Sequence, residues 1–308
     1  TPITEDPFVY YGVKNTFTLT RAWVPDFVSW GSIGFFISAI LFSERAARQR
    51  SFWRADIVYS RDALILFQYI LLGRPLVYEA HTAPTWVSTF VAQRARKVVT
   101  ISQGLKDAYI ERGISAEKII VAHDAVDLDF SHAPSQAEAR NRLGLPLDKK
   151  IALYVGKIDR EKGAHILAAA SELLQDIQVV LIGDGPELSG IKAAFPKVIC
   201  LPATPYKDLP FVLPAADILV IPNSGLSPTF STYTSPLKLF AYLASGVPIV
   251  ASDVPAIREV VGDDAVRFFR PDDVQALVAA LENTHQPRPT PRAHTWHERA
   301  TGILKGLA

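Results

Sequence analysis

Two lysines flank a short polar loop in the stretch YVGKIDREKG. An apolar run ends at Gly156, Lys157 and Lys162 follow, and the pattern of a helix starts at Gly163. Ligands of open parallel sheets bind at the ends of strands, where glycine lets them approach the backbone. Two ammonium groups can meet a diphosphate there as point charges. A solvated, charged surface loop explains this stretch equally well when it is taken alone.

A second candidate is the stretch TSPLKLFAYLASG, which begins at Thr234. Ser235 is a residue type that caps helices, and Pro236 suits a first helical turn. With Ser235 as the cap, we expect the backbone amides of Leu237 and Lys238 among the free donors of that turn. Such a helix start attracts anions, and the charge of Lys238 would strengthen the attraction. A capped core helix that carries a stray lysine is the alternative.

A third stretch, VVLIGDGPEL, places Gly183 and Gly185 at another strand end, where a tight turn is the ordinary interpretation. Three such elements in one region together favour a phosphate or nucleotide ligand. The sequence has no Walker loop and no GxGxxG fingerprint, so it does not support a P-loop or a hydride-transfer site. It also lacks an HExxH motif and a Cys/His ligand set for zinc, and we expect no metal site.

These loops need strands and helices to position them, and the chain of 308 residues is long enough for two domains. Apolar runs that read as strands alternate with helical patterns in both halves, which predicts an α/β fold with parallel sheets. A polar stretch between the halves reads as a linker. The expected units are an N-terminal domain (1–130), a linker (131–148), a C-terminal domain (149–285), and an extended spacer with a closing helix (286–308).

Composition limits the function classes. The formal charge is +1, so the chain has no global basic field of the kind that nucleic-acid binders use. A single cysteine excludes an internal disulfide and fits a reducing cytosol. The uncharged run Phe27 to Ser43 is short for a membrane span and predicts a buried or interfacial helix. Arg45, Arg48 and Arg50 follow it, so we expect a cytoplasmic protein that can contact the inner membrane face peripherally.

The order of several motifs resembles that of the family 4 glycosyltransferases, which have the GT-B fold. The motifs are YVGKIDREKG, LIGDGPEL, DLPFVLPAADILVIPNS, SPLKLFAYLASGVPIVASDVPAIREVV and VRFFRPDD, with weaker matches in ADIVYSRD, LVYEAH, VVTISQGLKD and EKIIVAHDAVDLD. The resemblance implies two Rossmann-like domains that face each other across a cleft. It also implies a retaining, metal-independent hexosyltransferase of bacterial polysaccharide or glycolipid synthesis. Such an enzyme uses a nucleotide-sugar donor, UDP-sugar by default, and a glycan or lipid-linked acceptor, with no separate cofactor and no nucleic acid.

The resemblance also assigns roles to particular residues. Lys157 and Lys162 would grip the donor diphosphate and stabilise the charge that develops on it as it departs. His81, at the end of VYEAH, would lie near the sugar, although a cap or core histidine is the alternative; His123, at another strand end, is a weaker candidate. The remaining donor-binding positions implied are Gly156, Gly183, Thr204 near the nucleobase, Ser235, Pro236, Leu237, Lys238 and Ala241.

Two departures from the family pattern matter. Relatives often carry a Glu-x7-Glu motif whose second glutamate binds the ribose, but Tyr233 and Ala241 stand at these positions. On a helix, Ala241 shares the side of Leu237, and its methyl group cannot accept a hydrogen bond. The first strand and the Gly-rich loop of the N-terminal domain are also expected to be missing. Two alternatives therefore stay open: a degenerate homologue that binds nucleotide without turnover, and a nucleotide-sugar epimerase of the same fold.

Overall fold

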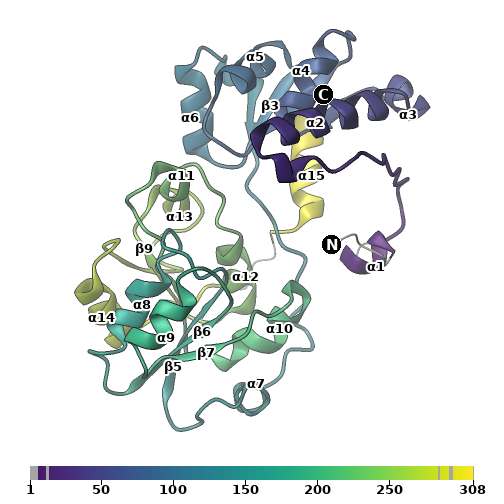
Figure 1. Cartoon of the computed structure of the whole chain (residues 1–308). Helices are drawn as coiled ribbons and strands as arrows, with labels where there is room; N and C mark the ends of the chain where they lie inside the picture. Colours follow the sequence, from purple (N-terminus) through teal and green to yellow (C-terminus); the bar gives the residue numbers. More distant parts are fainter. Residues whose placement is uncertain (1–5, 12–13, 284, 291–293, 308) are drawn as a thin grey trace.

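The computed structural model describes residues 6–11, 14–283, 285–290 and 294–307. They form two α/β parts, each built on its own parallel sheet (Figure 1). The predicted fold class, with two parallel sheets of which the N-terminal one is smaller, is confirmed.

The N-terminal sheet has four parallel strands in the order β1-β2-β3-β4. Its strands are β1 (Val58–Ser60), β2 (Leu76–Ala80), β3 (Lys97–Thr100) and β4 (Ile119–Val121). The helices of this part are α1 (Pro7–Tyr11), α2 (Ser32–Ala47), α3 (Arg50–Arg54), α4 (Ala63–Ile70), α5 (Trp86–Arg94) and α6 (Gln103–Glu111). The sequence fits this arrangement because each strand is a short apolar run and a helix connects it to the next.

The C-terminal sheet has six parallel strands in the order β10-β9-β8-β5-β6-β7. The strands are β5 (Lys150–Val155), β6 (Ile177–Ile182), β7 (Ile199–Leu201), β8 (Ile218–Ile221), β9 (Ile249–Ser252) and β10 (Arg267–Phe269). The helices are α8 (Ala164–Ala170), α9 (Leu188–Ala194), α10 (Leu209–Val212), α11 (Pro228–Ser231), α12 (Leu237–Ser245), α13 (Pro255–Arg258) and α14 (Val274–Glu282). The chain leaves β5 first towards β6 and later returns to its other side with β8. Doubly wound sheets bind ligands outside the carboxyl ends of the strands at such a switch point.

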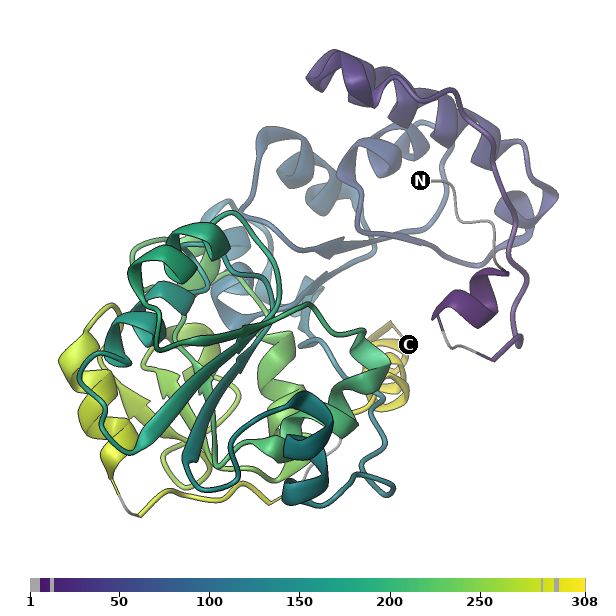
Figure 2. The same ribbon diagram turned by 60° about the horizontal axis from the view of Figure 1, so that its bottom comes forward.

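The last helix, α15 (Trp296–Leu307), returns to the N-terminal part (Figures 1 and 2). Ile303 and Leu307 pack in one apolar cluster with Val77 of β2 and Val99 of β3. The closing helix of the chain is thus part of the N-terminal core, so the chain crosses twice between the two sheets.

The predicted linker (131–148) contains a helix, α7 (Gln136–Leu143), that its polar composition did not predict. The polar composition hid a capping box, in which Ser135 and Glu138 satisfy each other's backbone amides. Arg140 of this helix is 4% exposed and reaches the carbonyl of Ala215 and the carboxylate of Asp217. The helix therefore packs against the C-terminal part. The domain boundaries themselves stay predictions.

The uncharged run of the N-terminal part forms most of α2, preceded by a 3-10 turn (Val28–Trp30). Its apolar side chains are largely uncovered: Ile33 is 73% exposed, Phe35 50% and Phe36 49%. The helix is therefore not buried, and the interfacial alternative of the prediction is the one that its exposure fits. None of the helices in the described part of the chain is both long and apolar enough to cross a membrane.

Candidate active site

The loop after β5 is held against the end of β6 by backbone contacts. The amide of Gly156 donates to the carbonyl of Ile182 at 2.9 Å, and that of Ile158 donates to Asp184 at 2.7 Å. Gly183 has a φ of 156°, and a Cβ there would lie 1.9 Å from the carbonyl oxygen of Gly156. Only glycine permits this approach of the two strand ends, so the three sequence stretches singled out above begin to converge here.

The other end of the same loop packs against the segment that follows β8. Gly163 has a φ of 70°, and a Cβ there would lie 1.7 Å from the carbonyl oxygen of Pro222. The amide of Ser224 donates to the carbonyl of Glu161 at 3.0 Å. The loop 156–163 therefore lies at the switch point between β5 and β8. Asn223, which is 3% exposed, has a buried Oδ1 without a hydrogen-bond partner among the described residues.

Lys238 carries a buried ammonium group at this point. Its Nζ lies 3.7 Å from the ring centroid of Tyr154 and has no hydrogen-bond partner within the described chain. A Cβ on Gly156 would stand 3.2 Å from the same nitrogen. Burial, and next the nearby charge of Lys162, lower the pKa of Lys238 well below its ordinary value. A buried cation without a partner is unfavourable, and an incoming anion would relieve that cost.

The two other lysines belong to the loop itself. The amide of Lys162 donates to Asp159 Oδ1 at 2.9 Å, and its Nζ lies 5.2 Å from the ring centroid of Phe230. Burial lowers the pKa of the Lys162 amine. Lys157 is two-thirds exposed and lies 3.5 Å from Asp159 Oδ2. The arrangement therefore offers one exposed and two largely buried amines around the end of β5, which suits a group that carries more than one negative charge.

The start of α12 differs from the prediction. The helix starts at Leu237, with Pro236 as its N-cap residue and no side-chain cap. Ser235 does not cap it, because its Oγ accepts a hydrogen bond from the amide of Asp124 at 2.8 Å. The amide of Leu237 is not free either, since it donates to the carbonyl of Ser235 at 3.0 Å. Among the described residues the amide of Lys238 has no such partner and remains available to a ligand.

Two further residues that were predicted to bind the nucleotide-sugar donor, Ala241 and Thr204, differ in how far they are exposed. Ala241 is 1% exposed and belongs to the main apolar cluster of the C-terminal part, whereas Leu237, one turn before it, is 48% exposed. The face of α12 that was expected to carry both residues is therefore exposed only at Leu237. Ala241 lies in the core and cannot contact a ligand at the surface. Thr204 is half-buried and follows β7, at the same edge of the sheet as the loop after β5.

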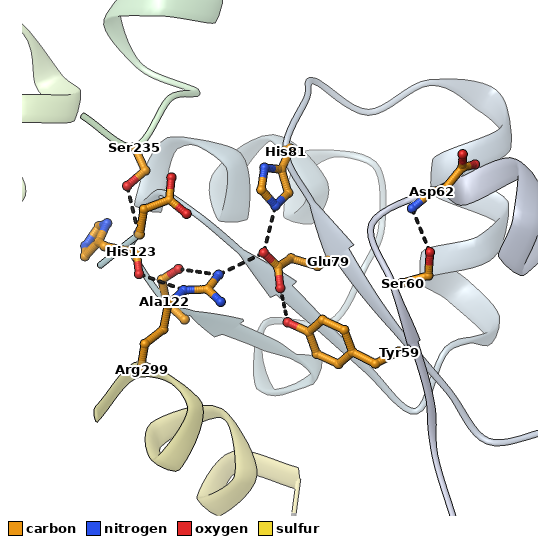
Figure 3. A network of polar contacts seen from close by, with 10 residues as sticks. Tyr59, Ser60, Asp62, Glu79, His81, Ala122, His123, Ser235 and Arg299 are labelled. Atoms are coloured by element: carbon orange, nitrogen blue, oxygen red, sulfur yellow. Dashed lines mark hydrogen bonds and ion pairs between the residues drawn. The ribbon is translucent and has the colours of Figure 1, made fainter. Parts of the chain in front are cut away.

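His81 lies in the N-terminal part, directly after β2. Its Nε2 is 2.7 Å from Glu79 Oε1, which also accepts a hydrogen bond from Arg299 of α15 at 2.9 Å (Figure 3). The hydroxyl of Tyr59 donates to the second oxygen of Glu79. Burial alone would raise the pKa of Glu79, but the hydrogen bonds from His81 and Tyr59 and the charge of Arg299 lower it to about 2. A carboxylate held in this way fixes the ring of His81.

The two parts of the chain touch beside these groups. The bond from the amide of Asp124 to Ser235 Oγ joins the segment after β4 to the start of α12. A second contact runs from the amide of Gln103 to Glu259 Oε2 at 2.8 Å. The Nδ1 of His123 lies 3.6 Å from Glu259 Oε1 and 3.1 Å from the carbonyl of Ile101, so His123 contributes to the contact between the parts. Burial lowers the pKa of His123 and raises that of Glu259 to about 7.

Sequence reasoning missed four residues around the site. Glu79 had a signal, because it lies two residues before His81 and alternate residues of a strand share a face. Arg299 and Asp124 had none, since their contacts join segments far apart in the chain, and no local pattern marks Asn223 as buried. No group of three His, Cys, Asp or Glu side chains that could hold a metal ion occurs in the described parts of the chain.

Two family profiles match the chain. Residues 149–286 match "Glycosyl transferases group 1", and residues 10–130 match "Glycosyltransferase Family 4". The first match contains the loop after β5 and α12, and the second contains His81.

Named relatives are similar in sequence to parts of this chain. The protein named "Putative teichuronic acid biosynthesis glycosyltransferase TuaC" of Bacillus subtilis (strain 168) is 34% identical over 148 residues, which are 48% of this chain and 36% of TuaC. The D-inositol 3-phosphate glycosyltransferase of Mycobacterium bovis (strain BCG / Pasteur 1173P2) is 27% identical over 231 residues, which are 70% of this chain and 46% of the relative. The chain thus spans less than half of the length of these relatives.

Solved structures show the same fold. Sucrose-phosphate synthase from Thermosynechococcus elongatus has a TM-score of 0.72 at 19% identity, over 89% of this chain and 78% of the other. HepE from Anabaena in complex with UDP-glucose has a TM-score of 0.65 at 19% identity, over 86% of this chain and 76% of HepE. HepE has also been solved with UDP. These likenesses confirm the GT-B fold that the sequence predicts.

Proposed function

The chain belongs to the group 1, family 4 glycosyltransferases, and from this we propose that it moves a sugar from a nucleotide-diphosphate sugar to a hydroxyl group of a glycan or lipid-linked acceptor. We propose UDP-sugar as the donor, transfer with retention at the anomeric carbon, and a place in polysaccharide or glycolipid synthesis. The named relatives fit this range, since one is assigned to teichuronic acid synthesis and another glycosylates an inositol phosphate.

One observation carries the donor assignment: the unpartnered, buried ammonium of Lys238 at the end of β5. Lys162 is a second amine with a pKa lowered by burial in the same place. A diphosphate would supply the missing counter-charge, and the amide of Lys238 would add a neutral donor. Lys157, which is exposed, would close over the ligand from outside.

The chemistry follows from that placement. The acceptor oxygen forms a bond to the anomeric carbon while the bond from that carbon to the diphosphate oxygen breaks. The hydroxyl proton passes to the departing diphosphate, on which negative charge grows. Cations that are already fixed around this charge stabilise the transition state more than the ground state, because the charge is larger there.

The acceptor side of the cleft falls to the N-terminal part. His81 is about one-third exposed and is oriented by Glu79, so it can meet a sugar hydroxyl while the carboxylate holds its ring. The bond between Asp124 and Ser235 keeps this part beside the start of α12. This geometry supports the role near the sugar that the resemblance implies for His81.

We further propose that the protein works on the cytoplasmic side and contacts the inner membrane face peripherally. Trp30 and Phe36 are examples of the exposed aromatic side chains around α2, at 67% and 49%. Arg45 in the last turn of the same helix supplies positive charge that an anionic surface attracts, and Arg48, its C-cap residue, pairs with Glu44. Retention on anionic vesicles at low salt, and release at high salt, is the expected behaviour.

The test of the donor assignment is calorimetric titration with UDP and GDP, followed by an assay of UDP release from a panel of UDP-sugars. We expect UDP to bind, and Lys162→Ala to weaken binding roughly 10- to 100-fold, as expected for loss of a charged hydrogen-bond partner. Lys192→Ala, on the surface of α9, is the matched control and should bind UDP normally.

Each outcome separates the rivals. Failure of both nucleotides to bind would overturn the proposal. Binding without turnover of any sugar would favour the degenerate homologue, in which Ala241 replaces a ribose ligand. Conversion of the UDP-sugar itself without transfer would favour the epimerase.

A further inference from the structure

We infer that the acceptor is an amphiphile, whose hydroxylated head occupies the cavity beside His81 while its apolar chain lies in an adjoining groove between α2, α4 and α5. The inference rests on the proposed function and names the class of its second substrate. It comes from two neighbouring cavities that share lining residues: one carries charged and polar side chains, and the lining of the other is almost wholly apolar.

The first cavity has a mixed lining, with charged and polar side chains among apolar ones, and it lies against the candidate active site. It has a volume of about 500 Å³, and its polar lining includes Arg61, Asp62, Tyr78, His81 and Thr85. Asp62 Oδ1 accepts the amides of Leu64 and Ile65 at the start of α4, which leaves Oδ2 without a partner among the described residues. Carboxylate, guanidinium and imidazole groups at one cavity suit a ligand that carries several hydroxyl groups.

The second cavity is a groove of about 360 Å³ with an apolar lining. It is lined by Phe36, Ala39 and Ile40 of α2, by Leu64 and Phe67 of α4, and by Trp86 of α5. Within the described lining the polar side chain is Gln68, and a hydrogen bond from Ser43 already engages it. The groove thus offers mainly carbon surface, which suits an aliphatic chain.

The two cavities form one continuous surface. Leu64 and Val87 line both cavities. Of two adjacent residues, Phe35 lines the first cavity and Phe36 lines the groove. A single molecule can therefore place a polar head near His81 and run its chain over Leu64 into the groove. The groove side chains are uncovered without it, with Ile40 39% and Trp86 72% exposed. Burial of this surface by a chain is favourable.

The probe is a series of β-glucosides with methyl, hexyl and octyl chains, used below their critical micelle concentrations with the full chain. Binding is measured by calorimetry and by the perturbation of tryptophan fluorescence. A methylene that is partly or fully buried strengthens binding about two- to fourfold. We therefore expect octyl glucoside to bind roughly 100-fold or more tightly than methyl glucoside.

Two variants on one helix locate the effect. Ile40 lines the groove and is 39% exposed, whereas Phe42 on the same helix is 41% exposed and is not part of the described lining. Ile40→Asp should abolish most of the gain with chain length, and Phe42→Asp should keep it. Circular dichroism and thermal unfolding establish that both variants fold. If Ile40→Asp does not fold, Trp86→Ala is measured instead and should reduce the gain at least threefold.

The results that overturn the inference are distinct from those that overturn the function. Affinity that does not change with chain length excludes the groove as a chain site. An equal loss in Ile40→Asp and Phe42→Asp, matched by an equal loss of vesicle binding, assigns this surface to a membrane and not to the acceptor chain. Failure of UDP to bind would overturn the donor proposal, and the glucoside series would still report on the groove.

Discussion

Arg299 and Glu79, 220 positions apart in the chain, form a buried ion pair at 2.9 Å that joins the closing helix to the N-terminal sheet. Their side chains are only 9% and 10% exposed. Arg299 also donates to the carbonyls of His123 and Ala122, at 2.8 and 3.2 Å. The same carboxylate orients His81. One ion pair therefore links the last helix, the core of the N-terminal part and the candidate catalytic histidine.

Removal of Arg299 should destabilise the protein strongly. Arg299→Ala leaves the Glu79 carboxylate buried without its charged partner, which typically costs about 3–5 kcal/mol. We expect this loss in the free energy of unfolding, measured by urea denaturation at pH 7. Without Arg299, the Glu79 carboxylate that orients His81 is no longer held in place. The rate of UDP release by the folded fraction should therefore fall, while UDP affinity should not change.

Arg258 supplies the control for that measurement. It pairs with Asp253 and Asp263 at the surface, where its side chain is 36% exposed. Exposed pairs contribute little, so Arg258→Ala should change the free energy of unfolding by no more than about 1 kcal/mol. Equal effects of the two substitutions would contradict the importance assigned to the buried pair.

The acid stability of the protein should depend on Glu79. Its pKa is lowered from 4.5 to about 2 in the folded state, so it contributes stability that is fully present above about pH 4.5. That contribution is lost as the pH falls through about 2 and amounts to about 3 kcal/mol at most. Glu79→Gln should lack this acid-dependent loss. Parallel curves of unfolding free energy against pH for the two proteins, from pH 6 to 2, would contradict the prediction.

Binding of UDP should take up a proton through Lys238. Burial holds the pKa of this amine well below its ordinary value in the free protein, and a diphosphate beside it would raise that pKa. In the pH range between the two values, UDP binding takes up protons and its affinity falls as the pH rises. Calorimetry in two buffers of different ionisation enthalpy measures the number of protons.

Lys238→Met should abolish that proton uptake and weaken UDP binding. Lys157→Met is the matched control, because Lys157 is two-thirds exposed and its amine is already solvated in the free protein. It should weaken binding and keep the uptake. Proton uptake that persists in Lys238→Met would assign the effect to another group, with Lys162 the next candidate.

Much of the fold was predictable because its signals are local. Apolar runs that alternate with helical patterns predicted the two parallel sheets, whose described strands number four and six. The gathering of the Gly156, Gly163 and Gly183 segments followed from parallel topology, since the carboxyl ends of parallel strands meet at one edge. The position of Lys238 in that group followed from its helix.

The rest depends on contacts that no local pattern encodes. Ser235 has the residue type and spacing of a helix cap, but its hydroxyl oxygen instead accepts a hydrogen bond from the amide of Asp124 in the N-terminal part. Ala241 has the helical spacing of the ligand-facing residues, but it is buried in the apolar core between α12 and the sheet. In the sequence, Arg299 is one charged residue of an amphipathic helix. Its pairing with Glu79 follows only from the packing of that helix against the N-terminal part.

The last prediction concerns the glycine contact that shapes the site. Gly183→Ala places a Cβ 1.9 Å from the carbonyl oxygen of Gly156 in a backbone conformation that L residues rarely adopt. The loop after β5 must then move, so we expect lower thermal stability and UDP binding at least 10-fold weaker. Gly190→Ala is the control: it lies in α9 with no atom within 4 Å of a Cβ, and should raise stability by up to about 1 kcal/mol through helix propensity. If Gly183→Ala bound UDP normally, the close approach of β5 and β6 would not be what shapes the diphosphate site, because the lysines would then keep their positions without it.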